Sequence, residues 1–269
     1  MNIEQFFYEH PVFRYEEFAA WKVTQGDIKP GSVNMALQYY VKSGQLRLIR
    51  RKLYVVIPPD QSADDFIVDP YLVAAKASDD SVLGYHSALA LMGMAYSSFG
   101  QFTYITQRKN KSFEFQNQWF QPVSFSTRLQ NKVFTYVETI DRQGVSISVT
   151  NVARTFVDVL DRVGLSGGWE EVCRAVSNIV VLNVDEVIEY CLLLGNARLN
   201  AKVGYFLSQR EGAFAVNEKQ LQPLLVAVPK TPVYVSKRSQ EKCQLVKPWN
   251  ILLPESVVNR TWEEPDADI

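Results

Sequence analysis

The spacing of apolar residues predicts that the chain begins with two short helices, over residues 3–9 and 15–23. In the second segment, Tyr15, Phe18 and Ala19 recur at the interval that places side chains on one face of a helix. These three side chains are therefore expected to face a core.

A third helix is predicted from Ser32 to Ser43. Ser32 follows a helix-breaking Lys-Pro-Gly sequence and is a good capping residue, and Gly44 suits the left-handed position that ends a helix. Hydrophobic spacing assigns Val33, Ala36, Leu37, Tyr40 and Val41 to an inward stripe, and Asn34, Met35, Gln38, Tyr39 and Lys42 to the outward face. The outward face is mostly polar and carries no acid.

Two strands are predicted next, over residues 45–49 and 53–57, joined at a basic tip of Arg50, Arg51 and Lys52. Helix, turn, helix and hairpin is the order of a winged helix-turn-helix. In that fold the helix after the turn enters the major groove of DNA, and the hairpin contacts the backbone or the minor groove. The sequence therefore predicts double-stranded DNA as a partner.

Charge strengthens this interpretation, although the whole chain has a net charge of −1. Residues 28–59 contain no Asp or Glu, and the cations expected to contact phosphates there are Lys29, Lys42, Arg47, Arg50, Arg51 and Lys52. Contacts to around five phosphates would give a logarithmic salt slope of about −4 to −5. Ser32, Asn34 and Gln38 suit base edges, and Tyr39 completes the predicted DNA-binding set. The alternative is a winged-helix module that contacts a protein.

A polar, proline-containing stretch at residues 58–62 predicts a domain boundary near residue 60. We expect a winged helix-turn-helix domain at 1–60 and a mixed α/β domain with an antiparallel-leaning sheet at 66–269, which is an α+β fold. The helices predicted in the second domain are 69–77, 86–94, 152–163, 169–178, 184–194 and 201–207, and the strands are 102–107, 112–125, 133–139 and 145–148.

The second domain carries two basic clusters that could extend a DNA footprint, bind RNA or form a solvated face. The first is Arg108, Lys109, Lys111, Arg128 and Lys132, and the second is Lys230, Lys237, Arg238, Lys242 and Lys247. Aromatic residues interleave with the first cluster and either stack on bases or pack in a strand core: Phe113, Phe115, Trp119 and Phe120.

Catalytic constellations are poorly supported by the sequence. His10 and His86 are the only histidines, and neither has a nucleophile in a recognisable context. Residues 164–168 lack the Lys-Ser/Thr that follows a phosphate-binding loop, and Gly31-Ser32 lacks the close carboxylates that a nucleotidyltransferase uses to hold metal ions. We therefore expect no enzyme, no cofactor and no metal.

The composition is that of a globular protein, with 269 residues, of which 47% are hydrophobic and 21% charged. No run of 18 apolar residues could span a membrane, and the first residues lack the basic start of a signal peptide. Three widely spaced cysteines form neither a disulfide framework nor a zinc-site pattern. A cytoplasmic location is the expectation.

Several segments resemble the AbiEi-type antitoxin family over most of the chain. Within residues 32–58, the matching positions are Leu37, Ser43, Gly44, Leu46, Leu48, Arg51, Tyr54 and Pro58; further similarity lies in residues 69–74, 84–93, 149–158, 167–170, 198–207 and 247–251. The family usually has Gly where this chain has Lys52, for which a positive φ angle is more costly.

The resemblance implies the antitoxin of a type IV toxin–antitoxin, or abortive-infection, system. Such an antitoxin represses its own operon by binding repeats in the promoter. The resemblance also implies a functional partner, a nucleotidyltransferase toxin, which is opposed without a stable complex being required.

Overall fold

The computed structural model describes residues 2–26, 29–235 and 242–263. The contacts between residues divide the chain into two compact units. Unit 1 comprises residues 1–83, 100–124 and 139–148, and unit 2 comprises residues 84–99, 125–138 and 149–269. The winged-helix region and the segments that follow residue 60 as far as Leu83 therefore belong to one unit.

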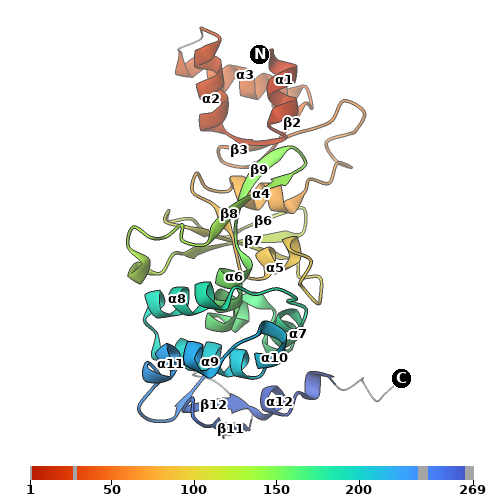
Figure 1. Cartoon of the computed structure of the whole chain (residues 1–269). Coiled ribbons are helices and arrows are strands. Elements are labelled where there is room, and N and C mark those ends of the chain that lie inside the picture. Colours follow the sequence, from red (N-terminus) through yellow and green to blue (C-terminus); the bar gives the residue numbers. More distant parts are fainter. Residues whose placement is uncertain (1, 27–28, 236–241, 264–269) are drawn as a thin grey trace, which may run out of the picture. The chain divides into compact units, whose positions relative to one another are not determined.

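Unit 1 begins with three helices, which gather beside β3 in Figure 1. They are α1 (Ile3–Glu9), α2 (Tyr15–Thr24) and α3 (Pro30–Lys42), so the two predicted N-terminal helices are confirmed. The predicted start of the third helix at Ser32 is wrong by two residues, because proline is preorganised for the first helical position. Ser32 does not cap the helix; its Oγ donates to the carbonyl of Lys29 at 2.7 Å.

A three-stranded antiparallel sheet completes this region, in the order β1-β3-β2. β2 (Leu46–Arg50) and β3 (Leu53–Val56) form the predicted hairpin, which we call the wing, and β1 (Val12–Arg14) pairs with β3. The sequence did not predict β1, because three residues are too few to show an alternating pattern. Lys52 has a φ of 67°, so the wing turn adopts the left-handed geometry without the family's glycine.

Aromatic side chains form the core beneath these helices. Its buried members are Phe6, Phe7, Phe13, Phe18, Val33, Leu37 and Leu46, and Tyr15, Ala19, Ala36 and Tyr40 pack against it. The predicted inward stripes of the second and third helices are thus confirmed except at Val41. Val41 is 36% exposed, because it lies in the last turn of α3, towards the wing groove described below.

A six-stranded mixed sheet in the order β6-β7-β5-β4-β9-β8 lies mainly in unit 1. Its strands are β4 (Val82–Leu83), β5 (Gln101–Thr106), β6 (Phe113–Phe115), β7 (Gln118–Ser124), β8 (Val137–Arg142) and β9 (Val145–Thr150). β5 pairs in parallel with β7, whereas β4 with β5 and β6 with β7 are antiparallel. Helix α4 (Pro70–Lys76) precedes β4, with Asp69 as its cap. The predicted strand at 133–139 is shifted, because residues 133–136 form turns and β8 begins at Val137.

Unit 2 is mainly helical, with α8, α9 and α11 close together in Figure 1. Its elements are α5 (His86–Leu91), α6 (Val152–Asp161), α7 (Trp169–Ser177), α8 (Val184–Leu194), α9 (Ala197–Ser208), α10 (Glu211–Phe214), α11 (Glu218–Val226), α12 (Glu255–Val258) and the strands β10 (Val233–Tyr234), β11 (Cys243–Val246) and β12 (Ile251–Pro254). None of the helices and strands that follow α9 was predicted from the sequence. The predicted α+β class is confirmed, and no helix among the described residues is long and apolar enough to cross a membrane.

Candidate nucleic-acid interface

Helix α3 presents its predicted outward face to solvent. Val33 and Leu37 are 4% and 2% exposed and hold the helix on the aromatic core. The side chains of Asn34, Gln38 and Lys42 are exposed on the other side. Tyr39 is 64% exposed on the same face. The face therefore offers amide, hydroxyl and ammonium groups and no carboxylate.

A groove of about 260 Å³ lies between α3 and the wing. Asn34, Gln38 and Lys42 line it from the helix, and Leu48 and Tyr54 line it from β2 and β3. The groove is therefore lined by both polar and apolar side chains. This groove between α3 and the wing places both elements beside whatever occupies it.

Two of the predicted phosphate-binding arginines in the wing are engaged inside unit 1. Arg47 donates to the carbonyl of Ala63 at 2.7 Å, and its guanidinium carbon lies 5.3 Å from the centre of the Phe115 ring. Arg50 donates to the carbonyl of Ala77, and its guanidinium carbon lies 4.4 Å from the centre of the Phe113 ring. Both side chains are half-buried, so part of their donor capacity serves the fold.

The other two wing cations differ from each other. Lys52 Nζ lies 2.6 Å from Glu16 Oε1, whereas Arg51 is exposed and forms no ion pair with any residue that the structure describes. Burial opposes ionisation of Glu16, but the hydrogen bond and the charge of Lys52 outweigh it and lower the pKa of this carboxyl. No sequence pattern indicates the Lys52–Glu16 pair, because its two residues are 36 positions apart.

At the start of α3, Lys29 is exposed and Ser32 is half-buried. The structure therefore brings Asn34, Gln38, Tyr39 and Lys42 together on one helix face and places Lys29 before that helix. Among the six predicted phosphate contacts, Lys29, Lys42 and Arg51 are exposed and form no ion pair within the described part of the chain.

The first basic cluster of the sequence is divided between the two units. Arg108, Lys109 and Lys111 belong to unit 1, whereas Arg128 and Lys132 belong to unit 2. Arg128 donates to the carbonyls of Leu194 and Gly195 at the end of α8, where a cation complements the helix dipole. Of the interleaved aromatic residues, Phe115 and Phe120 are 9% and 1% exposed and pack in the strand core, whereas Trp119 is 40% exposed. In the second cluster, Lys237 and Arg238 lie outside the described residues.

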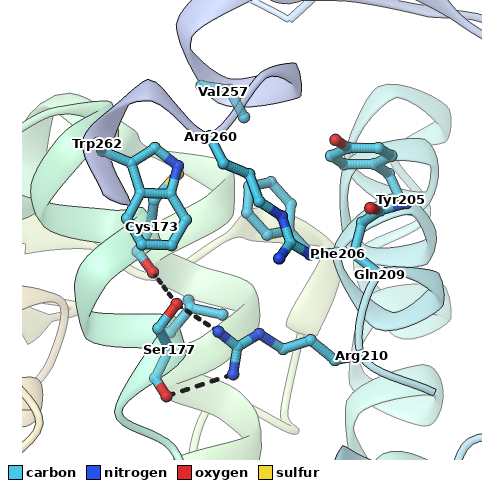
Figure 2. Close-up of a pocket in the computed structure, with 10 residues that line it drawn as sticks. Cys173, Ser177, Tyr205, Phe206, Gln209, Arg210, Val257, Arg260 and Trp262 are labelled. Atoms are coloured by element: carbon cyan, nitrogen blue, oxygen red, sulfur yellow. Dashed lines mark hydrogen bonds between the residues drawn. The ribbon is translucent and has the colours of Figure 1, made fainter. Parts of the chain in front are cut away.

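Unit 2 contains a small pocket beside α7 and α9, shown in Figure 2. Its volume of about 20 Å³ has room for one water molecule. Arg210 donates to the carbonyl and the Oγ of Ser177, and Ser177 Oγ donates to the carbonyl of Cys173. Burial raises the pKa of the Cys173 thiol to about 12, so this cysteine is not a thiolate at neutral pH.

His86 also belongs to a buried arrangement in unit 2. Its Nε2 lies 3.3 Å from Glu171 Oε1, and burial lowers the pKa of the imidazole. Glu171 in turn accepts hydrogen bonds from the backbone N–H groups of Tyr96 and Ser97. These contacts join α7 to the segment after α5. No group of three His, Cys, Asp or Glu side chains suited to a metal ion occurs among the described residues.

No protein-family model and no curated protein matches the chain. Among solved structures, the crystal structure of the RV2827C protein from Mycobacterium tuberculosis is similar, with a TM-score of 0.58. The match covers 94% of this chain and 90% of that chain at 15% sequence identity. At this identity the likeness concerns the fold alone.

Proposed function

We propose that this protein is a sequence-specific DNA-binding repressor, the antitoxin of a type IV toxin–antitoxin system that represses its own operon. The AbiEi-type motifs of the sequence support the antitoxin part of this proposal. Its partners are repeats in the promoter DNA and, functionally, a nucleotidyltransferase toxin. Residues on α3 read the bases, and cations before α3, at its end and at the wing tip bind phosphates.

The observation that carries the proposal is the exposed, acid-free face of α3 beside a wing with an exposed Arg51. Asn and Gln side chains pair with the edge of adenine through two hydrogen bonds, and Lys and Arg side chains bind phosphate oxygens. A helix whose opposite face is anchored by Val33 and Leu37 holds these groups in fixed positions, and such positions are needed for sequence discrimination.

Fluorescence anisotropy of the full chain with a duplex from its own upstream region, and with a scrambled duplex, tests this function. We expect a preference for the upstream duplex that persists at near-physiological salt. Asn34→Ala and Gln38→Ala should each weaken binding to the upstream duplex by about tenfold, because each removes a base contact. Binding to the scrambled duplex should hardly change.

Gln222→Ala is the matched control, because Gln222 is an exposed amide on α11 in unit 2. This variant should bind like the unmodified protein. Equal and weak binding of both duplexes, abolished by salt, would rule out sequence-specific repression by this helix.

A second function has a specific observation in its favour. The same surface exposes apolar side chains, with Met35 at 67% and Leu48 at 48% exposure. Buried apolar anchors contribute most to protein–protein binding, so a winged-helix module that docks a protein partner such as the toxin is the alternative. Met35→Lys with Leu48→Lys should abolish co-purification with a nucleotidyltransferase encoded next to this gene under that alternative. Under the repressor function, the double variant leaves co-purification unchanged.

A further inference from the structure

A second concave site lies within unit 1 and shares no lining residue with the α3 groove. This pocket has a volume of about 520 Å³, which falls in the range of small-molecule sites. Six cationic side chains line it, namely Arg14, Arg50, Arg51, Lys52, Lys76 and Arg108, with two carboxylates, Glu16 and Asp79. We call it the cationic pocket. It shares the wing tip, including Arg51, with the DNA-binding surface proposed above.

The cations converge from four separate parts of unit 1. Arg14 ends β1, the wing tip supplies three residues, Lys76 ends α4, and Arg108 follows β5. Such convergence of like charges opposes folding unless counter-charges or a bound anion offset it. The positive charges that line the pocket must therefore be offset by negative charges nearby.

Carboxylates balance part of this charge. Glu17, behind the pocket, lies 2.5 Å from Lys76 Nζ and 3.6 Å from Arg14 Nε through its two oxygens. Burial opposes ionisation of Glu17, but hydrogen bonds from Lys76 and from the Arg14 backbone outweigh it and lower the pKa of the carboxyl. Together with the Glu16–Lys52 pair, these contacts keep the two lysines and Arg14 in place.

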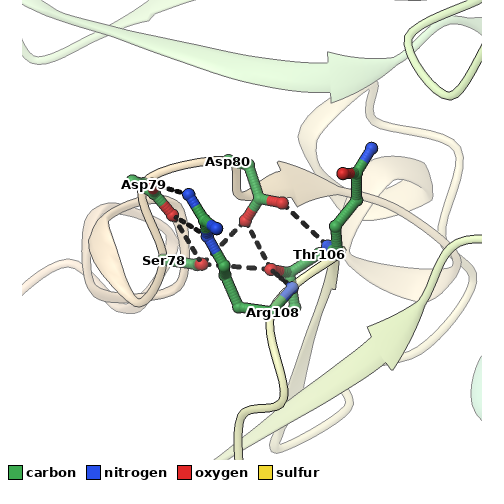
Figure 3. Close-up of polar contacts among 6 residues, drawn as sticks. Ser78, Asp79, Asp80, Thr106 and Arg108 are labelled. Atoms are coloured by element: carbon green, nitrogen blue, oxygen red, sulfur yellow. Dashed lines mark hydrogen bonds and ion pairs between the residues drawn. The ribbon is translucent and has the colours of Figure 1, made fainter. Parts of the chain in front are cut away.

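Arg108 is held at the rim by a polar network that Figure 3 shows. Its Nε and one terminal nitrogen donate to Asp79 at 2.9 and 2.6 Å, and these hydrogen bonds lower the pKa of Asp79 to about 2. The backbone N–H of Arg108 donates to Thr106 Oγ1 at 3.0 Å, and the Thr106 hydroxyl donates to Asp80. The network fixes the backbone below Arg108, and its side chain, although paired with Asp79, is 63% exposed.

Arg50 and Arg51 carry the remaining positive charge. Neither forms an ion pair with a carboxylate in the described part of the chain. Arg50 is oriented by the Ala77 carbonyl and the Phe113 ring, so its guanidinium is a preorganised part of the wall. Arginine binds phosphate and carboxylate oxygens through two parallel hydrogen bonds. Several guanidinium groups in one pocket therefore suit an anion with more than one negative charge, such as a chain of phosphates.

We propose that the cationic pocket binds the phosphate chain of a small phosphorylated molecule, with Arg50, Arg51 and Arg108 as the binding groups. The volume exceeds that of a single phosphate, and the excess positive charge matches a chain of two or three phosphates. A DNA duplex presents the same phosphate chemistry, but its major groove alone is about 12 Å wide, so a duplex can touch only the rim of a pocket this small.

Isothermal titration calorimetry of the full chain with inorganic tripolyphosphate tests the proposal. We expect binding of one tripolyphosphate per chain. Arg108→Gln should weaken it by about tenfold, because a charge-assisted contact is lost. Asp79→Asn should strengthen it, because this change releases Arg108 and removes a competing negative charge.

Lys109→Gln is the matched control, because Lys109 is the next residue, is exposed and does not line the pocket. It should leave tripolyphosphate binding unchanged. Failure to bind tripolyphosphate at millimolar concentration would overturn the proposal, as would equal weakening by Arg108→Gln and Lys109→Gln.

The same variants are measured with the upstream duplex. If Arg108→Gln weakens duplex binding but not tripolyphosphate binding, the pocket is part of the DNA surface and the proposal is wrong. Loss of DNA specificity in the Asn34→Ala and Gln38→Ala variants leaves the proposal about the cationic pocket intact.

Discussion

Arg50 and Arg51 are neighbours in the chain and meet different surroundings. Arg50 ends β2 and its side chain lies on the Phe113 ring and the Ala77 carbonyl, whereas Arg51 belongs to the turn and faces solvent. A guanidinium on an aromatic face with a carbonyl acceptor stabilises the fold. An exposed guanidinium at a turn contributes little to stability and is available for binding.

This difference predicts that the same substitution at the two arginines affects DNA binding in one case and stability in the other. Arg51→Gln should reduce the logarithmic salt slope of duplex binding by about 1 and leave the melting temperature unchanged. Arg50→Gln should lower the free energy of unfolding by about 1–2 kcal/mol, through lost hydrogen bonding and ring contact. Thermal melts and salt titrations of both variants check this. An Arg50→Gln variant as stable as the unmodified protein would contradict the assignment.

Lys202 in α9 predicts a pH dependence. Its side chain is 3% exposed and donates to the carbonyls of Leu160 and Asp161, and burial lowers its pKa from 10.5 to about 8. Between pH 8 and 10.5 the unfolded chain binds this proton and the folded chain does not, so stability rises with pH in that window.

Comparison with Lys202→Met isolates this effect. Between pH 8 and 9.5, the free energy of unfolding of the unmodified protein should rise by up to about 2 kcal/mol relative to that of the variant. Urea unfolding at several pH values measures the difference. A difference that is constant with pH would mean that Lys202 keeps its ordinary pKa.

At the scale of elements, α9 depends on close contact with a distant aromatic side chain. The Trp249 ring, in the turn between β11 and β12, lies against Gly204, and a Cβ atom there would overlap the ring, with Cε3 at 2.6 Å. Gly204→Ala should therefore destabilise the protein by about 1–3 kcal/mol through overpacking. Chemical denaturation measures this loss.

Gly212→Ala in α10 is the control for this prediction, because no heavy atom lies within 4 Å of a Cβ placed there. Alanine has the higher helix propensity, so this variant should be slightly more stable, by about 0.5–1 kcal/mol. Equal effects of the two substitutions would show that Trp249 does not pack on Gly204 in solution.

Elements with a strong period were predicted well, but the start of α3 was not. The apolar stripe of α3 appears in the sequence as Val33 and Leu37, and both are buried. The helix nevertheless begins at Pro30, because the preference of proline for the first turn outweighs the capping preference of Ser32. β1 has only three residues and exists because β3 offers it an antiparallel partner. Its formation depends on a contact that local sequence does not contain.

At the scale of the whole molecule, the net charge of −1 hides local excesses of positive charge. Three cations on the candidate DNA surface, Lys29, Lys42 and Arg51, are exposed and form no ion pair with the described residues. Each phosphate contact adds about −0.9 to the logarithmic salt slope, so we expect a slope of about −3 for the upstream duplex.

Anisotropy measured between about 50 and 300 mM salt checks this slope. A slope near −5 would mean that Arg47, Arg50 and Lys52 leave their intramolecular partners and bind phosphates as well. This outcome would agree with the larger number of phosphate contacts that the basic sequence of the wing predicts.

The sequence by itself determined the α+β class, the order of helix, turn, helix and wing, and the polar face of α3. These features follow from short-range periodicity and capping, which a local stretch of chain expresses completely. Only the tertiary structure decided which basic residues are available. Arg47 and Arg50 are engaged by Phe115 and Phe113, more than sixty residues away, and the cationic pocket draws its walls from four segments. Contacts between distant segments arise when the chain folds on itself, and no local pattern encodes them.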